Sequence, residues 1–463
     1  MDILLSHGYT LLEDEAERAI MKPYPPLGLL YLSAHLKKAG LAVGVFDPTF
    51  AGADDFGRFI AREKPPVVGL YTNMMTRTNV LRQISICREA GCYVILGGPE
   101  PVNYAERYLA HGADIIVAGE GEQTLVDLLA ADRENEAALS AIPGIVFQGR
   151  DGIVRTEARG QIKKLDDQPF PDRAAIDIGR YLATWKTHHG ASSLSMITAR
   201  GCPYTCRWCS HSVFGHSYRH RSPENVADEL ATVIGDYHPE RIWYADDVFT
   251  MNAKWLRRFA DTISERGLIR PFEAISREDR LNEDVIRTLR DMQCARLWVG
   301  AESGSQRVLD AMDRRTNAAR MREMIIMLRD YGIETGTFIM LGYDRETTAD
   351  IAETRRHLLR ALPDTVLSTI AYPIKGTPFY DDVETRLVRK GRWEDNPDRL
   401  LGIGGRRSRR YYRHAEAWIG RSVSLARRLR RGRLFSLMNL RDLWRLTRAR
   451  LGMALAAGET GDG

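Results

Sequence analysis

Three cysteines, Cys202, Cys206 and Cys209, stand at C-x3-C-x2-C spacing directly after a short apolar stretch. Three thiolates in one tight loop can each bind one iron of a 4Fe–4S cluster. Because such a cluster normally has four cysteine ligands, one iron would be left without a protein thiolate. That open iron could chelate a small molecule through an amino and a carboxylate group. The spacing therefore predicts a cluster that binds and reduces a ligand.

A structural zinc site is the alternative interpretation of the same thiols. Cys3His is a normal zinc ligand set, and His211 stands two residues after Cys209. Structural zinc ligands usually come as two separated pairs, however, and the sequence has no second pair of this kind. The other cysteines, Cys87, Cys92 and Cys294, are scattered in apolar surroundings, which argues against a disulfide framework and indicates a reducing compartment.

The cysteine run and its surroundings resemble the radical S-adenosylmethionine (SAM) superfamily. The resemblance implies a 4Fe–4S cluster on the three thiolates and SAM on the open iron. An electron from the cluster would break a carbon–sulfur bond of SAM and release a 5′-deoxyadenosyl radical, chemistry that belongs to the cofactor. Trp208 occupies the place of the family's aromatic residue before the last cysteine, where an indole can shield the adenine and the cluster from water.

Length and composition limit what must position these residues. A chain of 463 residues exceeds what one hydrophobic core normally supports, so we expect two or more domains. With 44% hydrophobic and 27% charged residues, the composition is that of an ordinary globular protein. No run of about 18 apolar residues exists, and the start lacks a basic segment followed by an apolar one. We therefore expect a cytoplasmic location.

Residues 1–135 alternate strand and helix patterns with the regularity of βαβ units. Five stretches are predicted to be strands, namely 2–6, 41–46, 67–72, 93–96 and 114–118. The pattern predicts a parallel, doubly wound α/β sheet of Rossmann type. Ligands of such sheets bind outside the carboxyl ends of the strands.

Small and polar residues follow the third, fourth and fifth predicted strands. In chain order they are Thr72, Asn73, Met74, Gly97, Gly98, Pro99, Glu100, Gly119, Glu120, Gly121 and Glu122. Glycines let the backbone approach a large flat ligand, and none of these loops has the G-x-G-x-x-G spacing of dinucleotide sites. The loops resemble the cobalamin-binding domain that precedes the barrel in one large radical SAM subfamily. The resemblance implies that these residues contact cobalamin.

The D-x-H-x-x-G motif, whose histidine ligates cobalt in many cobalamin proteins, is absent from the sequence. The subfamily resembled here commonly lacks it too. His7, after the first predicted strand, is a candidate lower ligand, although a lone loop histidine is more often a hydrogen-bonding group. Glycine loops that merely close turns are the alternative interpretation of the strand ends.

Residues 136–190 are predicted to be a linker that contains a hairpin at 144–155 and a proline-rich run. Residues 191–380 then repeat a strand–helix unit. Six stretches are predicted to be its strands, namely 194–198, 241–245, 272–276, 296–300, 335–340 and 366–372. Six units fit the partial (β/α)6 barrel of the radical SAM superfamily better than a closed eightfold barrel.

Polar residues follow the predicted barrel strands, where the working residues of such barrels lie. Asp246 and Asp247, after the second strand, resemble the family segment that receives the methionyl amino group. Arg277, after the third, could pair with the methionyl carboxylate. Glu302 and Ser303, after the fourth, resemble the segment that contacts ribose and methionine. For each residue, a helix cap or a solvated charge is the alternative interpretation.

Residues 381–463 are predicted to be a basic helical tail. From Arg406 to Arg450 the sequence has fifteen arginines and two acids, a local charge of +13 that leaves −8 for the rest of a chain of net charge +5. Two helices are predicted, at 415–431 and 434–450, the second with an apolar face. Such a tail suits an anionic membrane surface and equally suits docking on the protein's own acidic remainder. Nucleic acid is disfavoured because no binding module accompanies the charge.

The resemblance covers about residues 1–380 and implies an enzyme that methylates an unactivated carbon of a small-molecule or lipid-like substrate. One SAM would methylate cobalamin and a second would supply the radical, with an external electron donor of flavodoxin or ferredoxin type. A ring-forming relative that acts on tetrapyrroles without methyl transfer is the second interpretation. A non-catalytic cobalamin-binding regulator is a third, which the intact cysteine triplet disfavours. If the tail contacts a membrane, the location would be peripheral at its inner face.

Overall fold

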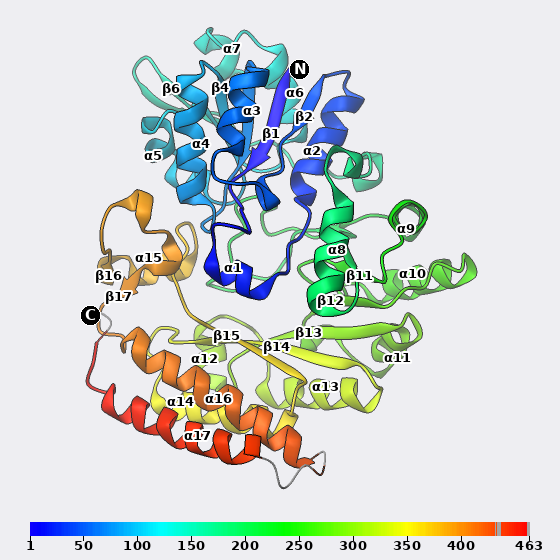
Figure 1. The fold of residues 1–463 in the computed structure, drawn as a ribbon, viewed down its shortest axis with the longest axis vertical. Helices are drawn as coiled ribbons and strands as arrows, with labels where there is room; N and C mark the ends of the chain where they lie inside the picture. The colour runs from blue at the N-terminus through cyan, green and yellow to red at the C-terminus, as the bar shows by residue number, and fades with distance from the viewer. Residues whose placement is uncertain (431, 433–436, 461–463) are drawn as a thin grey trace. The chain divides into compact units, whose positions relative to one another are not determined.

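The computed structural model describes residues 1–430, 432 and 437–460 and divides into two compact units (Figure 1). The first unit contains Met1–Pro203, Ser210–Trp243 and Gly391–Arg399, and the second contains Tyr204–Cys209, Tyr244–Lys390 and Leu400–Gly463. Parallel strands alternate with helices in both, which confirms the predicted α/β class.

A seven-stranded sheet in the order β2-β1-β3-β4-β5-β6-β7 forms the centre of the first unit. Its strands are β1 (Ile3–His7), β2 (Val43–Val45), β3 (Val67–Tyr71), β4 (Tyr93–Gly97), β5 (Ile115–Val117), β6 (Ile145–Gly149) and β7 (Gly152–Arg155). β1 to β5 are parallel, so the five predicted strands and their direction are confirmed. The strand order reverses between β1 and β3, the point where ligands of doubly wound sheets bind.

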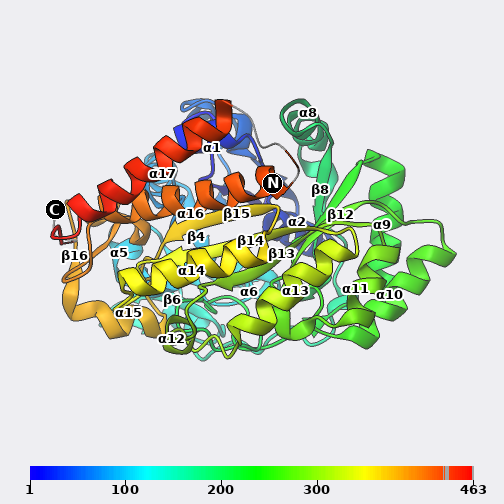
Figure 2. The same ribbon diagram turned by 90° about the horizontal axis from the view of Figure 1, so that it is seen from below.

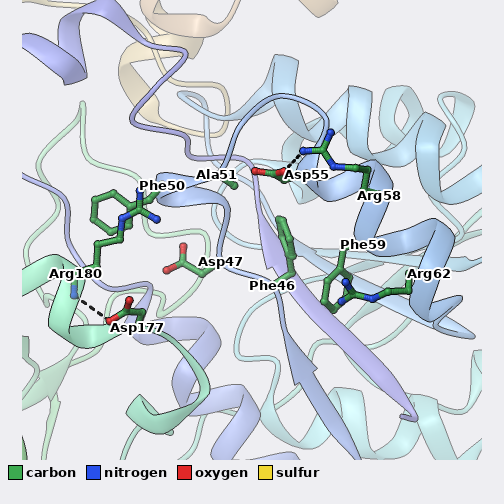
Figure 3. Close-up of a pocket in the computed structure, with 10 residues that line it drawn as sticks. All are labelled: Phe46, Asp47, Phe50, Ala51, Asp55, Arg58, Phe59, Arg62, Asp177 and Arg180. Atoms are coloured by element: carbon green, nitrogen blue, oxygen red, sulfur yellow. Dashed lines mark hydrogen bonds and ion pairs between the residues drawn. The ribbon is translucent and has the colours of Figure 1, made fainter.

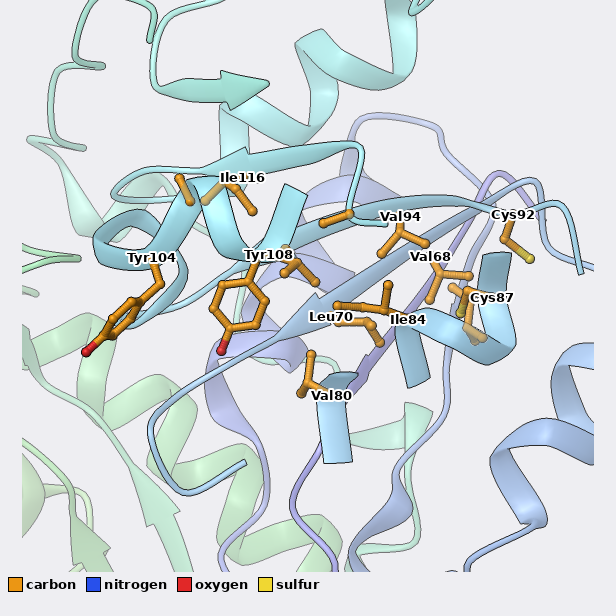
Figure 4. Packing of buried hydrophobic residues seen from close by; sticks show 14 of the residues in the cluster. Val68, Leu70, Val80, Ile84, Cys87, Cys92, Val94, Tyr104, Tyr108 and Ile116 are labelled. Atoms are coloured by element: carbon orange, nitrogen blue, oxygen red, sulfur yellow. The ribbon is translucent and has the colours of Figure 1, made fainter. Parts of the chain in front are cut away.

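Helices cover both faces of this sheet. The helices of one face are α2 (Leu27–Lys38), α6 (Glu122–Ala130) and α7 (Glu136–Ser140), and those of the other are α3 (Asp55–Glu63), α4 (Arg77–Glu89) and α5 (Ala105–Ala110). Figure 4 shows the second face, where Val80 and Ile84 of α4 and Tyr108 of α5 pack on Val68 and Val94 of the strands. The alternation of side chains along each strand supplies both faces with apolar residues.

Cys87 and Cys92 belong to this core (Figure 4). Burial raises the pKa of the Cys87 thiol, and the neighbouring Cys92 adds to the rise. A thiol with a raised pKa is a poor nucleophile and a poor metal ligand at neutral pH. These two cysteines therefore serve packing.

The hairpin predicted within the linker of residues 136–190 is instead part of the first sheet. β6 pairs antiparallel with β5, which places Val146 opposite Ile116 and Phe147 opposite Ile115. This pairing covers backbone groups of β5 that would otherwise form an open sheet edge. An alternating hairpin pattern is the same whether the hairpin is free or paired, so the sequence alone could not assign it to the sheet.

The remaining elements of the first unit are α1 (Glu15–Ile20), α8 (Ile178–His189), β8 (Ser193–Met196), β9 (Ala199–Arg200), β10 (Arg219–His220) and α9 (Pro223–Tyr237). α9 has a favourable start, since the Ser222 hydroxyl accepts a hydrogen bond from the Asn225 N–H and Pro223 takes the first helical position.

Residues 391–399, predicted to be part of the tail, pack in the first unit. Arg77 of α4 is fully buried, donates to the carbonyls of Trp393 and Asn396, and pairs with Asp398. Its guanidinium also lies 4.6 Å from the Trp393 ring. A buried arginine needs such partners, and because these three are more than 300 positions away in the chain, no local pattern shows them.

The second sheet has six strands in the order β15-β14-β13-β12-β11-β8, which confirms the predicted number. Its other strands are β11 (Arg241–Tyr244), β12 (Phe272–Ser276), β13 (Cys294–Glu302), β14 (Glu334–Leu341) and β15 (Thr365–Ile370). Within the second unit β12 to β15 are parallel. The helices between strands are α10 (Ala253–Glu265), α11 (Glu283–Asp291), α12 (Gln306–Ala311), α13 (Ala318–Asp330) and α14 (Thr348–Ala361).

Much of the predicted tail belongs to the second unit. It comprises α15 (Pro378–Val383), β16 (Leu387–Val388), β17 (Gly402–Ile403), α16 (Arg409–Arg430) and α17 (Leu437–Leu455). α16 lies between α14 and α17 (Figures 1 and 2). Both predicted tail helices are present, although residue 431 and residues 434–436 of the predicted ranges lie outside the described residues.

Candidate functional site

The three cysteines lie on an irregular loop between β9 and β10. None is in a disulfide; Cys202 and Cys206 are partly buried and Cys209 is exposed. Among the described residues, no three His, Cys, Asp or Glu side chains are already gathered as a metal site. Three thiols on one loop fit the donor chemistry of an iron–sulfur cluster.

Backbone hydrogen bonds of the second unit fix the middle of the cysteine loop. The Arg207 N–H donates to the Met312 carbonyl over 3.1 Å, and the Phe379 N–H donates to the Arg207 carbonyl over 2.9 Å. Trp208 packs against a buried apolar cluster that includes Met312 and Phe379. The indole thus anchors the loop, while its predicted place over the adenine stays a prediction.

Arg277, directly after β12, contacts the cysteine loop. Its Nη1 lies 3.8 Å from Cys206 Sγ, and its guanidinium lies 3.5 Å from the centre of the Tyr204 ring. Burial raises the pKa of the Cys206 thiol, and Arg277 opposes the rise. Arg277 also donates to Asp279 over 2.9 Å and to the Arg314 carbonyl over 3.0 Å. Its predicted pairing with a methionyl carboxylate stays a prediction.

Glu302 ends β13 in the left-handed region, with φ of +58°. The β13–β14 register shifts between Gly300 and Glu302. A non-glycine residue in this region costs of order 1–3 kcal/mol and is typical of functional sites. Removal from water raises the pKa of Glu302 to about 8, with Arg277 opposing and Glu278 adding to the rise. The strand end therefore presents a carboxyl that is largely protonated at pH 7 and that a bound cation would ionise.

The Glu302 carboxyl lies in a group of residues that includes Gly300, Glu278 and Arg314. A Cβ at Gly300 would lie 2.9 Å from Glu302 Oε1 and 3.2 Å from Arg314 Nη2, so only glycine leaves room for both side chains. Arg314 Nη2 donates to the Gly300 carbonyl over 2.8 Å and lies 3.5 Å from Glu278 Oε2. The sequence analysis missed Glu278 and Arg314; the available signal was that Glu278 directly follows the predicted arginine at a strand end.

Ser303 shapes the turn that follows. Its buried hydroxyl lies 3.1 Å from the Thr354 hydroxyl and accepts a hydrogen bond from the Ser305 N–H over 3.1 Å. After β11, Asp246 is buried and Asp247 is exposed. All three stand past strand ends, as the barrel pattern predicts, and their contacts with SAM stay predictions.

In the first unit, the loop after β3 contains Thr72, Asn73 and Met74. Thr72 is fully buried, and no described residue hydrogen-bonds its hydroxyl oxygen. Asn73 Oδ1 accepts from the N–H groups of Met75 and Thr76 over 2.9 and 3.2 Å, so this side chain closes the turn. Because buried polar groups normally have partners, the Thr72 hydroxyl is the group of this loop best suited to meet a ligand.

The loop after β4 brings bare backbone to the strand ends. Gly98 has φ of +106°, and a Cβ there would lie 2.4 Å from the Thr72 carbonyl oxygen. At Gly97 an added Cβ would meet nothing within 4 Å, so the backbone faces open space. Pro99 is partly buried beside them. This arrangement fits a flat ligand laid across the carboxyl ends of β3 and β4.

The loop after β5 forms ion pairs with the residues at the start and the end of the cysteine loop. Arg200 pairs with Glu120 and with Glu122, each over 2.7 Å, and Arg219 pairs with Glu120 over 2.7 Å. Arg200 stands two residues before Cys202. The sequence analysis missed both arginines, although their place at the two ends of the cysteine loop was a usable signal.

Glu100 is engaged in the same way, since it pairs with Arg77 and accepts a hydrogen bond from the Tyr108 hydroxyl over 3.0 Å. The three carboxylates predicted to contact cobalamin thus each meet a buried arginine. The loop after β5 turns at Gly119, which has φ of +88°, and Gly121 follows two residues later. Direct contact of these residues with cobalamin stays a prediction.

His7 is buried with both ring nitrogens in use. Nδ1 accepts from the Tyr9 N–H over 3.1 Å, and Nε2 lies 3.1 Å from Asp47 Oδ1. A cobalt ligand needs one nitrogen free, so the structure disfavours His7 in that role. His211, the fourth ligand of the zinc alternative, stacks on His216 at 4.0 Å.

A pocket of about 460 Å³ opens beyond the carboxyl end of β2 (Figure 3). It is lined by Phe46, Asp47, Phe50, Ala51, Asp55, Arg58, Phe59, Arg62, Asp177 and Arg180. Arg180 lies 4.6 Å from the Phe50 ring, and Arg58 pairs with Asp55. None of the predicted cofactor residues lines this pocket, so we assign it no part in the site.

Comparison with protein families matches both units. The B12 binding domain model matches residues 19–129, and the radical SAM superfamily model matches residues 196–358. The chain therefore contains a B12 binding domain followed by a radical SAM domain. This confirms the resemblance found in the cysteine motif, and the two domains imply SAM, a 4Fe–4S cluster and cobalamin as cofactors.

Individual proteins with similar sequences span most of the chain. An uncharacterized methyltransferase of Pyrococcus horikoshii is 29% identical over 386 residues, which cover 80% of this chain and 80% of that protein. The anaerobic magnesium-protoporphyrin IX monomethyl ester cyclase of Cereibacter sphaeroides is 26% identical over 387 residues, which cover 79% of this chain and 61% of the cyclase.

Among solved structures, the radical S-adenosylmethionine methyltransferase TsrM from Kitasatospora setae, with cobalamin and a 4Fe–4S cluster bound, has a TM-score of 0.68. It is 18% identical, and the match covers 84% of this chain and 79% of that one. At this identity the likeness establishes the fold, which is a Rossmann-like domain followed by a radical SAM domain.

Proposed function

We propose that this protein is a cobalamin-dependent radical SAM methyltransferase that acts on an unactivated carbon of a small-molecule or lipid-like substrate. The observation that carries the proposal is the buried ion-pair set of Arg200 with Glu120 and Glu122. It joins the start of the cysteine loop to the loop after β5 in the B12-binding domain. A reaction that uses both cofactors together requires that they be held in a fixed arrangement.

When bound, the cluster and SAM supply a carbon radical, and cobalamin carries the methyl group. Cys202, Cys206 and Cys209 would bind the cluster. Arg277 places a cation against Cys206, which favours the thiolate form. Glu302 offers a carboxyl whose pKa is about 8 and which can accept a hydrogen bond or yield its proton as SAM enters.

On the other cofactor, the open backbone at Gly97 and the Thr72 hydroxyl would meet the corrin. The carboxylates of Glu100, Glu120 and Glu122 would act through the loops that they position. Names of similar proteins add to the case for methyl transfer, because the Pyrococcus horikoshii and Kitasatospora setae proteins are both described as methyltransferases.

The test is anaerobic reconstitution with iron, sulfide and cobalamin, followed by incubation with methyl-labelled SAM under a strong reductant. We expect 5′-deoxyadenosine, label on the recovered cobalamin, and label in the product when a lipid extract is added. The Cys206→Ala variant should lose iron and form no 5′-deoxyadenosine. Zinc instead of iron in the anaerobically purified protein would overturn the proposal.

A ring-forming radical enzyme is the second candidate, and the observation in its favour is the match to the Cereibacter sphaeroides cyclase. The same incubation separates the two. Unlabelled product with a new ring and no label on cobalamin would favour the cyclase, whereas labelled product favours methylation. A cobalamin-binding regulator would form no 5′-deoxyadenosine at all.

An external electron donor of flavodoxin or ferredoxin type is part of the proposal. The radical step consumes an electron, and the cysteines outside the cluster loop, Cys87, Cys92 and Cys294, are buried. They are therefore unsuited to a second cluster that could deliver it. A cytoplasmic location with peripheral contact at the inner face of a membrane also belongs to the proposal.

A further inference from the structure

α17 packs on α16 through its polar side. Asn439 and Asp442 are its buried polar residues, 5% and 7% exposed. Asp442 pairs with Arg421 over 2.9 Å and with Arg428, and Asn439 Oδ1 accepts a hydrogen bond from Arg428 over 3.0 Å. The buried side of α17 is therefore ionic and hydrogen-bonded in its first half, and Ala449, Gly452 and Met453 are the buried residues of its second half. The most exposed leucines and the tryptophan of α17 take no part in it, whereas an ordinary surface helix would bury such side chains.

The outward side of α17 carries large apolar side chains. Leu440, Trp444 and Leu451, here called the apolar stripe, are 66%, 61% and 58% exposed. Their spacing of four and seven residues places them on one line along the helix. Leu437, Leu443 and Leu455 are exposed beside the stripe. Contiguous exposed apolar surface of this kind marks an interaction site.

The helix cannot simply turn this stripe inward. Gly452 faces α16 so closely that a Cβ there would lie 2.5 Å from the His414 ring. Rotation of α17 would bring a larger residue to this contact and would also separate Asp442 from both of its arginines. Separation would leave the buried Asp442 carboxylate without a partner, which is strongly destabilising. The contacts of α17 with α16 therefore keep the apolar stripe on the outward side of the helix.

Arginines surround the apolar stripe. Arg441, Arg448 and Arg450 are exposed, and the Arg448 guanidinium lies 5.6 Å from the Trp444 ring. Asp442 is the one acidic residue of α17, and its ion pairs face α16. The outward surface of the helix therefore combines aliphatic and indole groups with positive charge and no acid.

We propose that α17 docks on the surface of an anionic lipid bilayer, with the apolar stripe in the acyl boundary and the arginines on headgroup phosphates. A second copy of the chain is a poor occupant, because two such faces would oppose arginines without an acid between them. None of the helices in the described part of the chain is long and apolar enough to cross a bilayer, so the contact is superficial. The inference rests on the peripheral location proposed above and not on the radical chemistry.

The test is flotation of the reconstituted full-length protein with vesicles of phosphatidylglycerol and phosphatidylcholine, compared with vesicles of phosphatidylcholine alone. We expect binding to the anionic vesicles that weakens as salt is raised. Leu440→Ser with Trp444→Ser should reduce the bound fraction at least tenfold. Arg441→Glu with Arg448→Glu should abolish the preference for anionic lipid.

The matched control is Leu12→Ser with Ile20→Ser, two exposed apolar residues of the first unit, and it should float like the wild type. Formation of 5′-deoxyadenosine should be unchanged in all variants, which separates failure of this inference from failure of the enzymatic proposal. Equal flotation of the Leu440 and Trp444 variant would overturn the inference. So would concentration-dependent dimerisation that this variant abolishes, because the stripe would then bind a second copy.

Discussion

Carboxylates follow the strand ends of both sheets, but their surroundings differ. In the first unit, Glu120 and Glu122 are buried against Arg200 over 2.7 Å. In the second unit, Glu302 ends β13 and Glu346 follows β14, and removal from water raises the pKa of each to about 8. No ion pair to either carboxylate is found among the described residues. Strand-end acids thus serve architecture in one unit and remain available to ligands in the other.

The physical reason is the cost of burying charge. Removal from water raises the pKa of a carboxyl, and an arginine beside it opposes that rise. Glu346 accepts a hydrogen bond from the Gly342 N–H over 2.5 Å, yet its Oε1 has no partner among the described residues. Groups kept buried and incompletely satisfied are candidates for function, because a purely structural site would have paired them.

Removal of the arginine from the paired set should have the largest effect. Arg200→Ala leaves Glu120 and Glu122 buried without their shared partner, so we expect a loss of about 3–5 kcal/mol in the free energy of unfolding. Urea unfolding of the apoprotein measures it. Arg200→Met combined with Glu122→Gln should recover most of the loss, because Glu120 keeps its ion pair with Arg219 over 2.7 Å. A single variant as stable as the double one would contradict the structural role.

Glu302→Gln should lower the activity without lowering the stability. Because burial holds the carboxyl protonated at a cost in stability above pH 4.5, an amide of the same shape should not lower the free energy of unfolding and should raise it at neutral pH. Formation of 5′-deoxyadenosine should fall about 100-fold, as is typical when one positioned polar group at a reacting centre is lost. Glu334→Gln, an exposed glutamate at the opposite end of a barrel strand, is the matched control. Equal activity of both variants would remove Glu302 from the site.

Much of this comparison could be predicted from the sequence and part of it could not. Periodicity and turn residues located the parallel strands of both sheets, and the cysteine spacing located the cluster loop. The positions of Glu120 and Glu302 past strand ends were predicted as well. Their partners were not, because Arg200 is 80 positions from Glu120 and local patterns carry no information about such a distance.

Two further differences have the same origin. The hairpin of β6 and β7 belongs to the first sheet because β6 pairs with β5. Trp393 packs in the first unit, where its carbonyl accepts a hydrogen bond from Arg77. Both depend on tertiary contacts formed by residues whose local patterns are ordinary. The sequence placed the leucines and the tryptophan of α17 on one face correctly, but it could not show that the polar face would be the buried one.

The pH dependence of stability should report Glu346. Its pKa is about 8 in the folded protein and 4.5 for the free group, so the folded state binds more protons between these values. Stability should therefore be full below about pH 4.5 and fall as pH rises towards 8, by at most about 1.4 kcal/mol per pH unit. Glu346→Gln should reduce the slope between pH 5.5 and 6.5, and the slope that remains is the contribution of Glu302, whose pKa is also about 8. An unchanged slope would mean that Glu346 is ionised in the folded state.

Removal of an exposed ion pair should have the smallest effect on the free energy of unfolding. Arg207, next to Cys206, pairs with Asp382 over 2.7 Å, but both side chains are more than one third exposed. Water screens such a pair, so Asp382→Asn should change the free energy of unfolding by less than about 1 kcal/mol. The loop should keep its iron, because the Arg207 backbone bonds to Met312 and Phe379 remain. Loss of iron in this variant would mean that the side-chain pair, rather than the backbone, positions the cluster loop.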